Sequence, residues 1–279
     1  MVNETEQVVT IAGSDSGGGA GLQADLKTFQ ARDTFGMSII VALTAQNTKG
    51  VQDVFPVSTD FVTEQFNSLA DDMKIRAAKT GMLGDEEHIK NVAANIKRVD
   101  FGYFVVDPVM VAKGGYKLLD PSASKALIEH LIPLADVITP NIPEAEAILD
   151  RNIKTSTDMI EAAQALQDYG CKNVIIKGGH GKGNQSIDYV LLADGTHFWM
   201  SSPRVDTERT HGTGDTFSAC ITAELAKGAE MTTAIKTAKA FIQGAIAQGI
   251  QVGNGHGPTN HWATLSEDVE YHDDMEFEL

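Results

Sequence analysis

The chain has 279 residues, and its 38 acidic against 22 basic side chains give a formal charge of −16. This charge argues against a nucleic-acid partner, because no basic stripe is present to neutralise phosphates, and it favours a small-molecule substrate. No apolar run approaches the ~20 residues of a membrane span, the first ten residues lack signal-peptide features, and two cysteines fit a reducing compartment, so we expect a cytoplasmic protein without a membrane partner.

Short apolar runs alternate along the chain with longer amphipathic runs. Residues 7–13 (QVVTIAG) predict a buried strand, and the run LQADLKTFQAR after them predicts a helix. The same pair recurs at 37–46 and 61–73, and the alternation continues to the strand-like run NVIIKGG. Strands that alternate with helices indicate a mostly parallel sheet covered by helices on both faces.

The alternation of strand-like and helical runs ends toward the C-terminus. IDYVLLADG and THFWM are strand-like runs joined by Asp-Gly, which predicts a hairpin at a sheet edge. After Gly212 the pattern is helical. No linker-like stretch interrupts the chain, so we expect one domain over 1–262, followed by an acidic C-terminal tail over 263–279. A loosely held tail is favoured over a short docked helix.

Polar and glycine-rich segments follow the predicted strands, at the sheet edge where open α/β folds bind ligands. The segment SDSGGGAG is neither a P-loop nor a Rossmann fingerprint. Its glycines allow close approach to a ligand, or they form a turn in which Ser14 or Asp15 caps the next helix. Gln46 offers both a donor and an acceptor to a heterocycle, or it is a surface amide.

Four further polar side chains end the later strands. Asp107 and Glu144 are candidate Mg²⁺ ligands, and capping of a helix that starts near Pro143 is the alternative for Glu144. Asn141 can bond a phosphate oxygen. Lys177 supplies a point charge for phosphate, or it is a solvated lysine in a loop.

The sequence HGTGD places a carboxylate at the start of a helix. The amides of Thr213, Gly214 and Asp215 form a candidate nest for a transferred phosphoryl group. Asp215 beside them can accept the proton of a substrate hydroxyl. Helix capping is the alternative, but it does not account for glycines at both 212 and 214. We therefore predict that Asp215 is catalytic.

Together these segments resemble the ribokinase superfamily, and within it the branch that phosphorylates hydroxymethylpyrimidine for thiamine biosynthesis. The resemblance covers roughly residues 8–262 in the family's order. It implies a ribokinase-like α/β fold with an edge hairpin, ATP and Mg²⁺ as cofactors, and a homodimer. It also implies phosphorylation of 4-amino-5-hydroxymethyl-2-methylpyrimidine and then of its monophosphate.

The resemblance assigns roles residue by residue. Gln46 would pair with the aminopyrimidine, and the pocket around the ring would be lined by Gly13, Ala20, Met82 and Val109. The nucleotide phosphates and Mg²⁺ would be faced by Asn141, Glu144 and Lys177, with an anion hole formed by Gly212, Thr213 and Gly214. The segment 111–116 and the glycine-rich loop 179–183 are expected to close over the ligands.

One position departs from the branch, whose members often carry a cysteine where this chain has Asp215. Sugar and pyridoxal kinases of the superfamily carry aspartate there, so pyridoxal kinase activity is the main alternative. The run TAQNT, and Ala112 in place of a cysteine, favour the pyrimidine. A non-catalytic nucleotide sensor would have lost Asp215, Lys177 or the glycines, and a nicotinamide dehydrogenase would carry a Rossmann fingerprint.

Overall fold

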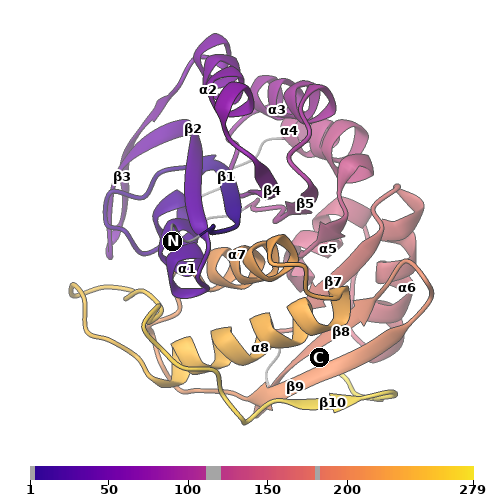
Figure 1. Cartoon of the computed structure of the whole chain (residues 1–279). Coiled ribbons are helices and arrows are strands. Elements are labelled where there is room, and N and C mark those ends of the chain that lie inside the picture. Colours follow the sequence, from indigo (N-terminus) through magenta and orange to yellow (C-terminus); the bar gives the residue numbers. More distant parts are fainter. Residues whose placement is uncertain (1–3, 111–120, 180–182) are drawn as a thin grey trace.

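The computed structural model describes residues 4–110, 121–179 and 183–279. They form a ten-stranded sheet in the order β10-β9-β8-β7-β6-β5-β4-β1-β2-β3, flanked by helices (Figure 1). The strands of the central part run parallel: β1 (Gln7–Gly13), β2 (Phe35–Asn47), β4 (Ile75–Thr80), β5 (Tyr103–Val106), β6 (Val137–Ile138) and β7 (Asn173–Lys177). The predicted mostly parallel α/β sheet is confirmed.

Helices cover both faces of this sheet. One face carries α1 (Gly21–Ala31), α7 (Thr213–Ala226) and α8 (Met231–Ala247), and the other carries α2 (Thr59–Asp72), α3 (Glu86–Arg98), α4 (Pro121–Ala126), α5 (Ile142–Leu149) and α6 (Ser156–Asp168). Consecutive strand residues alternate between the two layers, because successive side chains point to opposite faces. Val105 packs with α7 and α8, whereas Val106 packs in the larger core on the other side. Burial on both faces explains the continuous apolar runs.

Side-chain caps begin several of the helices in the second layer. Ser58, Asp85 and Thr155 accept backbone amides at the starts of α2, α3 and α6. In contrast, α1 and α7 begin at Ala20 and Gly212 without a side-chain cap. These two helix starts point to the strand ends where the candidate site lies.

The strand β3 (Gly50–Pro56) is not predicted by the sequence pattern. It pairs antiparallel with β2 through a tight turn and is the last strand on that side of the described sheet. None of its residues is buried, so it lacks the apolar signal from which a buried strand is recognised.

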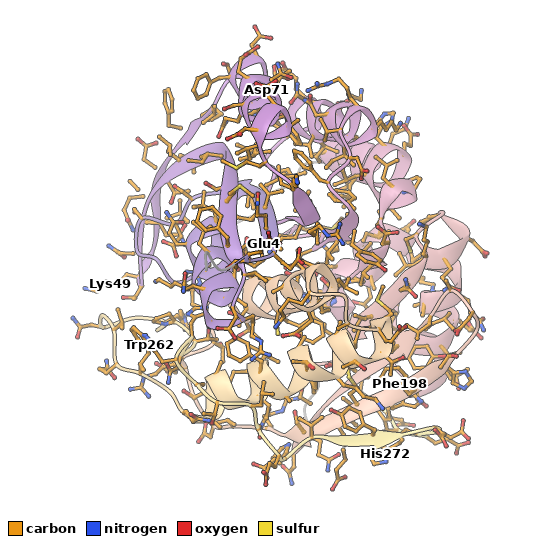
Figure 2. The ribbon with its side chains drawn as sticks, viewed as in Figure 1. Glu4, Lys49, Asp71, Phe198, Trp262 and His272 are labelled. Carbon is orange, nitrogen blue, oxygen red and sulfur yellow. The ribbon has the colours of Figure 1, made fainter. Side chains whose placement is uncertain are left out.

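The predicted hairpin forms from β8 (Gln185–Leu191) and β9 (His197–Pro203), but it is not the sheet edge. The C-terminal tail contributes β10 (Glu270–His272), which pairs antiparallel with β9, and Figure 2 labels His272 on this outer strand. The expectation of a loosely held tail is therefore wrong.

Beyond β10, the tail stays attached to the domain. The amide of Ser156 donates to Phe277, and the ring of Phe277 meets Trp199 edge-on at 5.3 Å between centroids. Apolar side chains at every second position, Met275, Phe277 and Leu279, pack against the core. This period-two pattern is that of an extended segment with one buried face. Among the described residues, no helix is long and apolar enough to cross a membrane.

Candidate active site

The predicted site residues gather around the start of α7, in two groups. One group lies at the ends of β5 and β7 and contains Asp107 and Lys177. The other lies between the glycine-rich loop after β1 and the end of β2, and contains Gly13 and Gln46. Both groups are within side-chain reach of the Gly212–Asp215 turn.

In the first group, the buried carboxylate of Asp107 forms an ion pair with the partly buried Lys177. Lys177 Nζ lies 3.2 Å from Asp107 Oδ1, and the same carboxylate accepts the hydroxyls of Thr139 at 3.2 Å and Ser218 at 3.3 Å. Burial alone would lower the pKa of Lys177, but the charges of Asp107 and Glu144 outweigh it and raise that pKa. Lys177 is thus a charged side chain held in an ion pair, 16% exposed, and not a solvated lysine in a loop.

Glu144 and Asn141 form a capping box at the start of α5. The Asn141 side chain accepts the amide of Glu144 at 2.9 Å, and Glu144 Oε2 accepts the amide of Asn141 at 2.8 Å. The capping role considered for Glu144 is therefore present. Burial raises the pKa of Glu144 to about 7, with Lys177 lowering it and Asp107 raising it. Because the Asn141 oxygen serves the cap, its Nδ2 group is the donor that remains for a phosphate.

The start of α7 has the geometry of an anion nest. Thr213 bonds its hydroxyl to the Thr210 carbonyl at 2.6 Å, and the amides of Gly214 and Asp215 meet no acceptor within the described residues. A Cβ on Gly214 would lie 3.3 Å from both the Asp107 carboxylate and the Lys177 ammonium. The turn therefore presents open backbone donors beside this ion pair.

Gly212 has a packing reason of its own. Its φ is +81°, in the left-handed region, and a Cβ there would lie 2.0 Å from the carbonyl oxygen of Gly19. Glycine is the residue that tolerates both conditions. The glycine at 212 is thus explained by contact with the glycine-rich loop, independently of any bound anion.

The glycine-rich loop is organised by Asp15. Its carboxylate accepts the amides of Gly17 at 2.8 Å and of Gly19 and Ala20 at 3.0 Å, and His211 Nε2 lies 2.9 Å from it. Burial alone would raise the pKa of Asp15, but His211 and the loop amides outweigh it and lower that pKa. These three amides stabilise the loop itself and are not open donors for a ligand.

The predicted pyrimidine-pocket residues lie around this loop, with one exception. Gln46 Nε2 lies 3.3 Å from His211 Nε2. Gly13 donates its amide to the Met82 carbonyl at 3.0 Å, and a Cβ on Gly13 would lie 2.4 Å from the Met82 methyl group. Val109 lies with the first group, where its amide donates to the Asp107 carbonyl at 2.9 Å. Ala20 follows Gly19 in the loop.

The sequence profile of the family described as phosphomethylpyrimidine kinase matches residues 15–260. The chain belongs to this family. A hydroxymethylpyrimidine/phosphomethylpyrimidine kinase of Haemophilus influenzae is 56% identical over 265 residues, which cover 94% of this chain and 98% of the relative. The resemblance inferred from the sequence motifs is confirmed.

Solved structures of two related enzymes share the fold of this family member. The pyridoxal kinase of Staphylococcus aureus, in complex with pyridoxal, has a TM-score of 0.88 at 37% identity and covers 99% of this chain and 100% of its own. The same kinase in complex with ADP has a TM-score of 0.89. A phosphomethylpyrimidine kinase from Clostridium difficile has a TM-score of 0.76 at 43% identity, with 86% and 99% covered.

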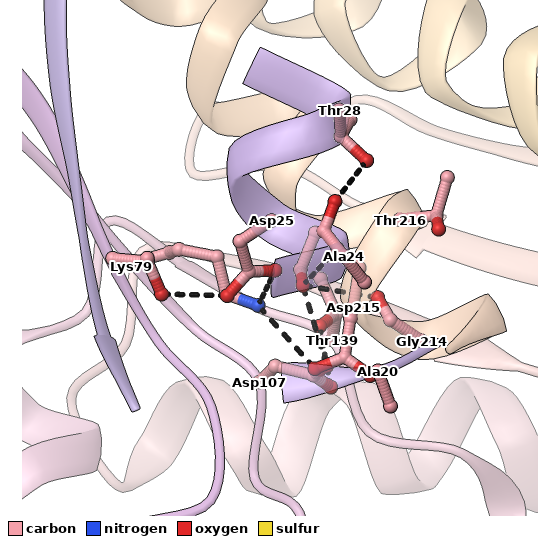
Figure 3. A network of polar contacts seen from close by, with 12 residues as sticks. Ala20, Ala24, Asp25, Thr28, Lys79, Asp107, Thr139, Gly214, Asp215 and Thr216 are labelled. Carbon is pink, nitrogen blue, oxygen red and sulfur yellow. Dashed lines mark hydrogen bonds and ion pairs between the residues drawn. The ribbon is translucent and has the colours of Figure 1, made fainter. Parts of the chain in front are cut away.

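This member of the phosphomethylpyrimidine kinase family also holds charged residues that the sequence reasoning missed. Lys79 Nζ lies 2.7 Å from Asp25 Oδ1 and 4.0 Å from Asp215 Oδ1 (Figure 3). A signal for both was present. Asp25 interrupts the apolar stripe of α1 between Leu22 and Phe29, and Lys79 occupies one of the buried positions of β4. A charge at a core position predicts a buried partner.

Two expectations fall partly or wholly outside the described residues. They concern Ala112 and the closure of the loops at 111–116 and 179–183. Within the described part, no group of three or more His, Cys, Asp or Glu side chains forms a cage for a metal ion.

Proposed function

We propose that the chain transfers the γ-phosphoryl group of ATP to the hydroxymethyl group of 4-amino-5-hydroxymethyl-2-methylpyrimidine, and then to the monophosphate so formed, in thiamine biosynthesis. The observation that carries this proposal is the placement of Asp215 beside open amides and the Lys177–Asp107 pair. It is supported by the printed function of the Haemophilus relative and by the ADP complex of the Staphylococcus kinase.

In the proposed reaction, Asp215 accepts the proton as the O–H bond of the substrate hydroxymethyl group breaks. That oxygen forms a bond to the γ-phosphorus, the bond to the bridging oxygen breaks, and ADP leaves with the electron pair. The amides of Gly214 and Asp215 and the ammonium of Lys177 are placed to stabilise the charge on the transferred group.

Mg²⁺ fits the donor set at the end of β5 and the start of α5. Such an ion commonly takes one or two carboxylates together with substrate phosphates and waters. Asp107 and Glu144 would hold it, because both carboxylates lie close enough to Lys177 to act on the pKa of that one ammonium. When bound, Mg²⁺ would neutralise charge on the nucleotide phosphates.

Pyridoxal phosphorylation is the second candidate, because the pyridoxal kinase of Staphylococcus aureus covers nearly the whole chain at a TM-score of 0.88. The two candidates differ in the acceptor and share the proposed transfer step. Gln46 is the residue we propose for recognition of the aminopyrimidine, together with Gly13, Ala20, Met82 and Val109 along the pocket.

The decisive experiment compares kcat/KM, with ATP and Mg²⁺, for hydroxymethylpyrimidine, its monophosphate and pyridoxal. We expect the two pyrimidines to be preferred. Preference for pyridoxal would replace this function by the second candidate, and turnover of none of the three would contradict both. In Asp215→Asn we expect kcat to fall by about 10²–10⁴ with little change in ATP affinity. Near-normal turnover would leave Asp215 as a residue of the helix start only.

We further propose that the active form is a cytoplasmic homodimer with a single kinase domain, which extends past the expected boundary of 1–262 because β10 and residues 275–279 pack on it. The use of ATP and two buried cysteines without a disulfide support the location. Apolar side chains on the outer surface of β2 and β3 support the dimer. Leu43 and Phe55 stand opposite each other across these strands and are 46% and 68% exposed.

A further inference from the structure

A buried ion pair lies directly behind Asp215. The side chains of Lys79 on β4 and Asp25 on α1 are both 0% exposed, and Lys79 Nζ lies 2.7 Å from Asp25 Oδ1. Thr10 on β1 donates its hydroxyl to the other carboxylate oxygen at 2.6 Å. Toward the site, the same ammonium lies 4.0 Å from Asp215 Oδ1 (Figure 3). One nitrogen thus joins α1, β4 and α7.

Fold stability does not by itself explain this pair. Taking two charges out of water costs more free energy than packing apolar side chains of the same volume, so buried ion pairs are weak evidence for stability. The position of the pair is the informative feature, because Lys79 Nζ also lies 4.0 Å from the carboxylate of the proposed base, Asp215. Burial alone would lower the pKa of Lys79, but the charges of Asp25, Asp215 and Asp107 outweigh it and raise that pKa, which keeps the ammonium charged.

We propose that Lys79 is a positioning residue for phosphoryl transfer, whose ammonium fixes the Asp215 carboxylate in place and keeps it ionised. The proposal rests on the base role of Asp215 given above. Asp25 and Thr10 hold Lys79 from behind, so that the ammonium stays where Asp215 needs it. An oriented and ionised carboxylate is what a general base requires.

Charged groups surround Asp215 on each neighbouring element: Asp25 on α1, Lys79 on β4, Asp107 after β5 and Lys177 at the end of β7. Burial and the charge of Asp215 raise the pKa of Asp25 to about 7, although Lys79 lowers it. Without the Lys79 ammonium, the two carboxylates would repel each other, and this repulsion disfavours the ionised form that Asp215 needs as a base. A protonated Asp215 cannot accept the proton of the substrate hydroxyl, so catalysis would require a higher pH.

The test measures pH profiles of kcat for the wild-type chain, Lys79→Met and Lys79→Met/Asp25→Asn, the last of which leaves no unpaired buried charge. In Lys79→Met we expect kcat at pH 7 to fall at least ~10-fold, and the acid limb of the profile, where kcat falls as the pH is lowered, to move up by about one pH unit or more. KM for ATP should stay within about twofold. In the double variant the acid limb should move up less, because the charge of Asp25 is removed as well. Asp25→Asn alone is nearly isosteric and keeps the ammonium, so its acid limb should move to lower pH.

A matched control is available on the same two helices. Arg32, which follows α1, forms an ion pair of 2.7 Å with Glu224 of α7, at the end of these helices away from Asp215. Arg32→Met/Glu224→Gln removes an ion pair that links the end of α1 to α7 and leaves Lys79 and Asp25 in place. This control should leave both kcat and the acid limb unchanged.

Folded Lys79 variants with wild-type kcat and acid limb would overturn the inference and leave the proposed function intact. A fall in kcat with an unmoved acid limb would also overturn it, because a purely structural defect gives that result. If the Lys79 variants do not fold, Asp25→Asn decides. The inference is wrong if the acid limb of this variant stays in place or moves to higher pH. Near-normal turnover by Asp215→Asn removes the base role, and this inference with it.

Discussion

The side chain of His211 joins the glycine-rich loop to the proposed pyrimidine recognition residue. Its Nε2 lies 2.9 Å from Asp15 Oδ2 and 3.3 Å from Gln46 Nε2. Asp15 has a lowered pKa and is ionised, so it can only accept, and His211 Nε2 must carry a proton. That N–H cannot also accept from an amide nitrogen. The Gln46 amide therefore turns its oxygen to His211 and its NH₂ group outward, an assignment made from the hydrogen-bond network.

This arrangement predicts that His211 and Gln46 act as one unit in substrate binding. Gln46→Ala should raise KM for hydroxymethylpyrimidine about 10-fold, and His211→Phe should raise it about three- to tenfold, with smaller effects on kcat. Because His211 acts through the Gln46 amide, the double variant should be no worse than Gln46→Ala alone. A double-mutant cycle on KM measures this. Effects that simply multiply would mean that the two residues contribute independently.

The β2–β3 hairpin is the element that we propose carries the dimer contact. Leu43 and Phe55 face the same side across the antiparallel pair, and Phe61 at the start of α2 adds a further aromatic side chain that is 60% exposed. Exposed apolar side chains that cluster mark interaction sites more often than scattered ones do. A second copy of the chain would bury them.

We expect the wild-type chain to have twice its monomer mass in light scattering after size exclusion, and Leu43→Asp/Phe55→Asp to have the mass of one chain. Placing charges at a buried contact costs more than most interfaces can compensate. Trp262→Ser is the control, since Trp262 is 85% exposed and belongs to a different segment. A wild-type monomer, or a variant that remains dimeric, would contradict the role of this hairpin.

Elements with a buried face could be predicted from the sequence, and elements without one could not. The runs that form β1 and β7 are mostly apolar because both sheet faces are covered, whereas β3 has no buried residue. The tail carries a period-two pattern at 275–279 that predicts an extended segment, but its acidic residues conceal that pattern.

The site could be predicted only where it follows strand ends. That rule places Asp107 and Lys177 together, as the structure has them, whereas Asp215 is predicted from the glycines at the start of a helix. The strand-end rule does not say which backbone amides already donate hydrogen bonds to a side chain. The role of Asp15 in holding the glycine-rich loop could therefore not be predicted. The Lys79–Asp25 pair joins residues 54 positions apart, and its geometry depends on how α1 packs on the sheet.

At the scale of the whole molecule, the segment after α8 returns to the start of α7 and inserts a buried histidine there. His261 Nε2 lies 3.0 Å from the Thr216 hydroxyl, which also meets Thr259 at 3.1 Å. Burial, and to a smaller extent the charge of Lys27, lower the pKa of His261 from 6.5 to about 4. The folded chain therefore keeps this imidazole neutral where the unfolded chain protonates it.

The sign of the resulting pH dependence follows from proton binding. Between about pH 6.5 and 4 the unfolded state binds more protons at this position, so stability is lost as the pH falls through that window. At pH 5 the loss is about 2 kcal/mol relative to pH 7, which corresponds to roughly 5 °C in Tm for a chain of this size. The non-titrating variant His261→Gln should lack this part of the decrease, whatever its Tm at pH 7.

Calorimetric Tm values at pH 7 and pH 5 for both proteins test this expectation. Carboxylates titrate alike in the two proteins, so the difference between their pH effects isolates His261. Equal decreases would mean that His261 is protonated in the folded state, with the imidazolium tolerated beside Thr216. The start of α7 would then hold an additional positive charge one residue from Asp215, and the acid limb of kcat would include the titration of His261 as well as that of the base.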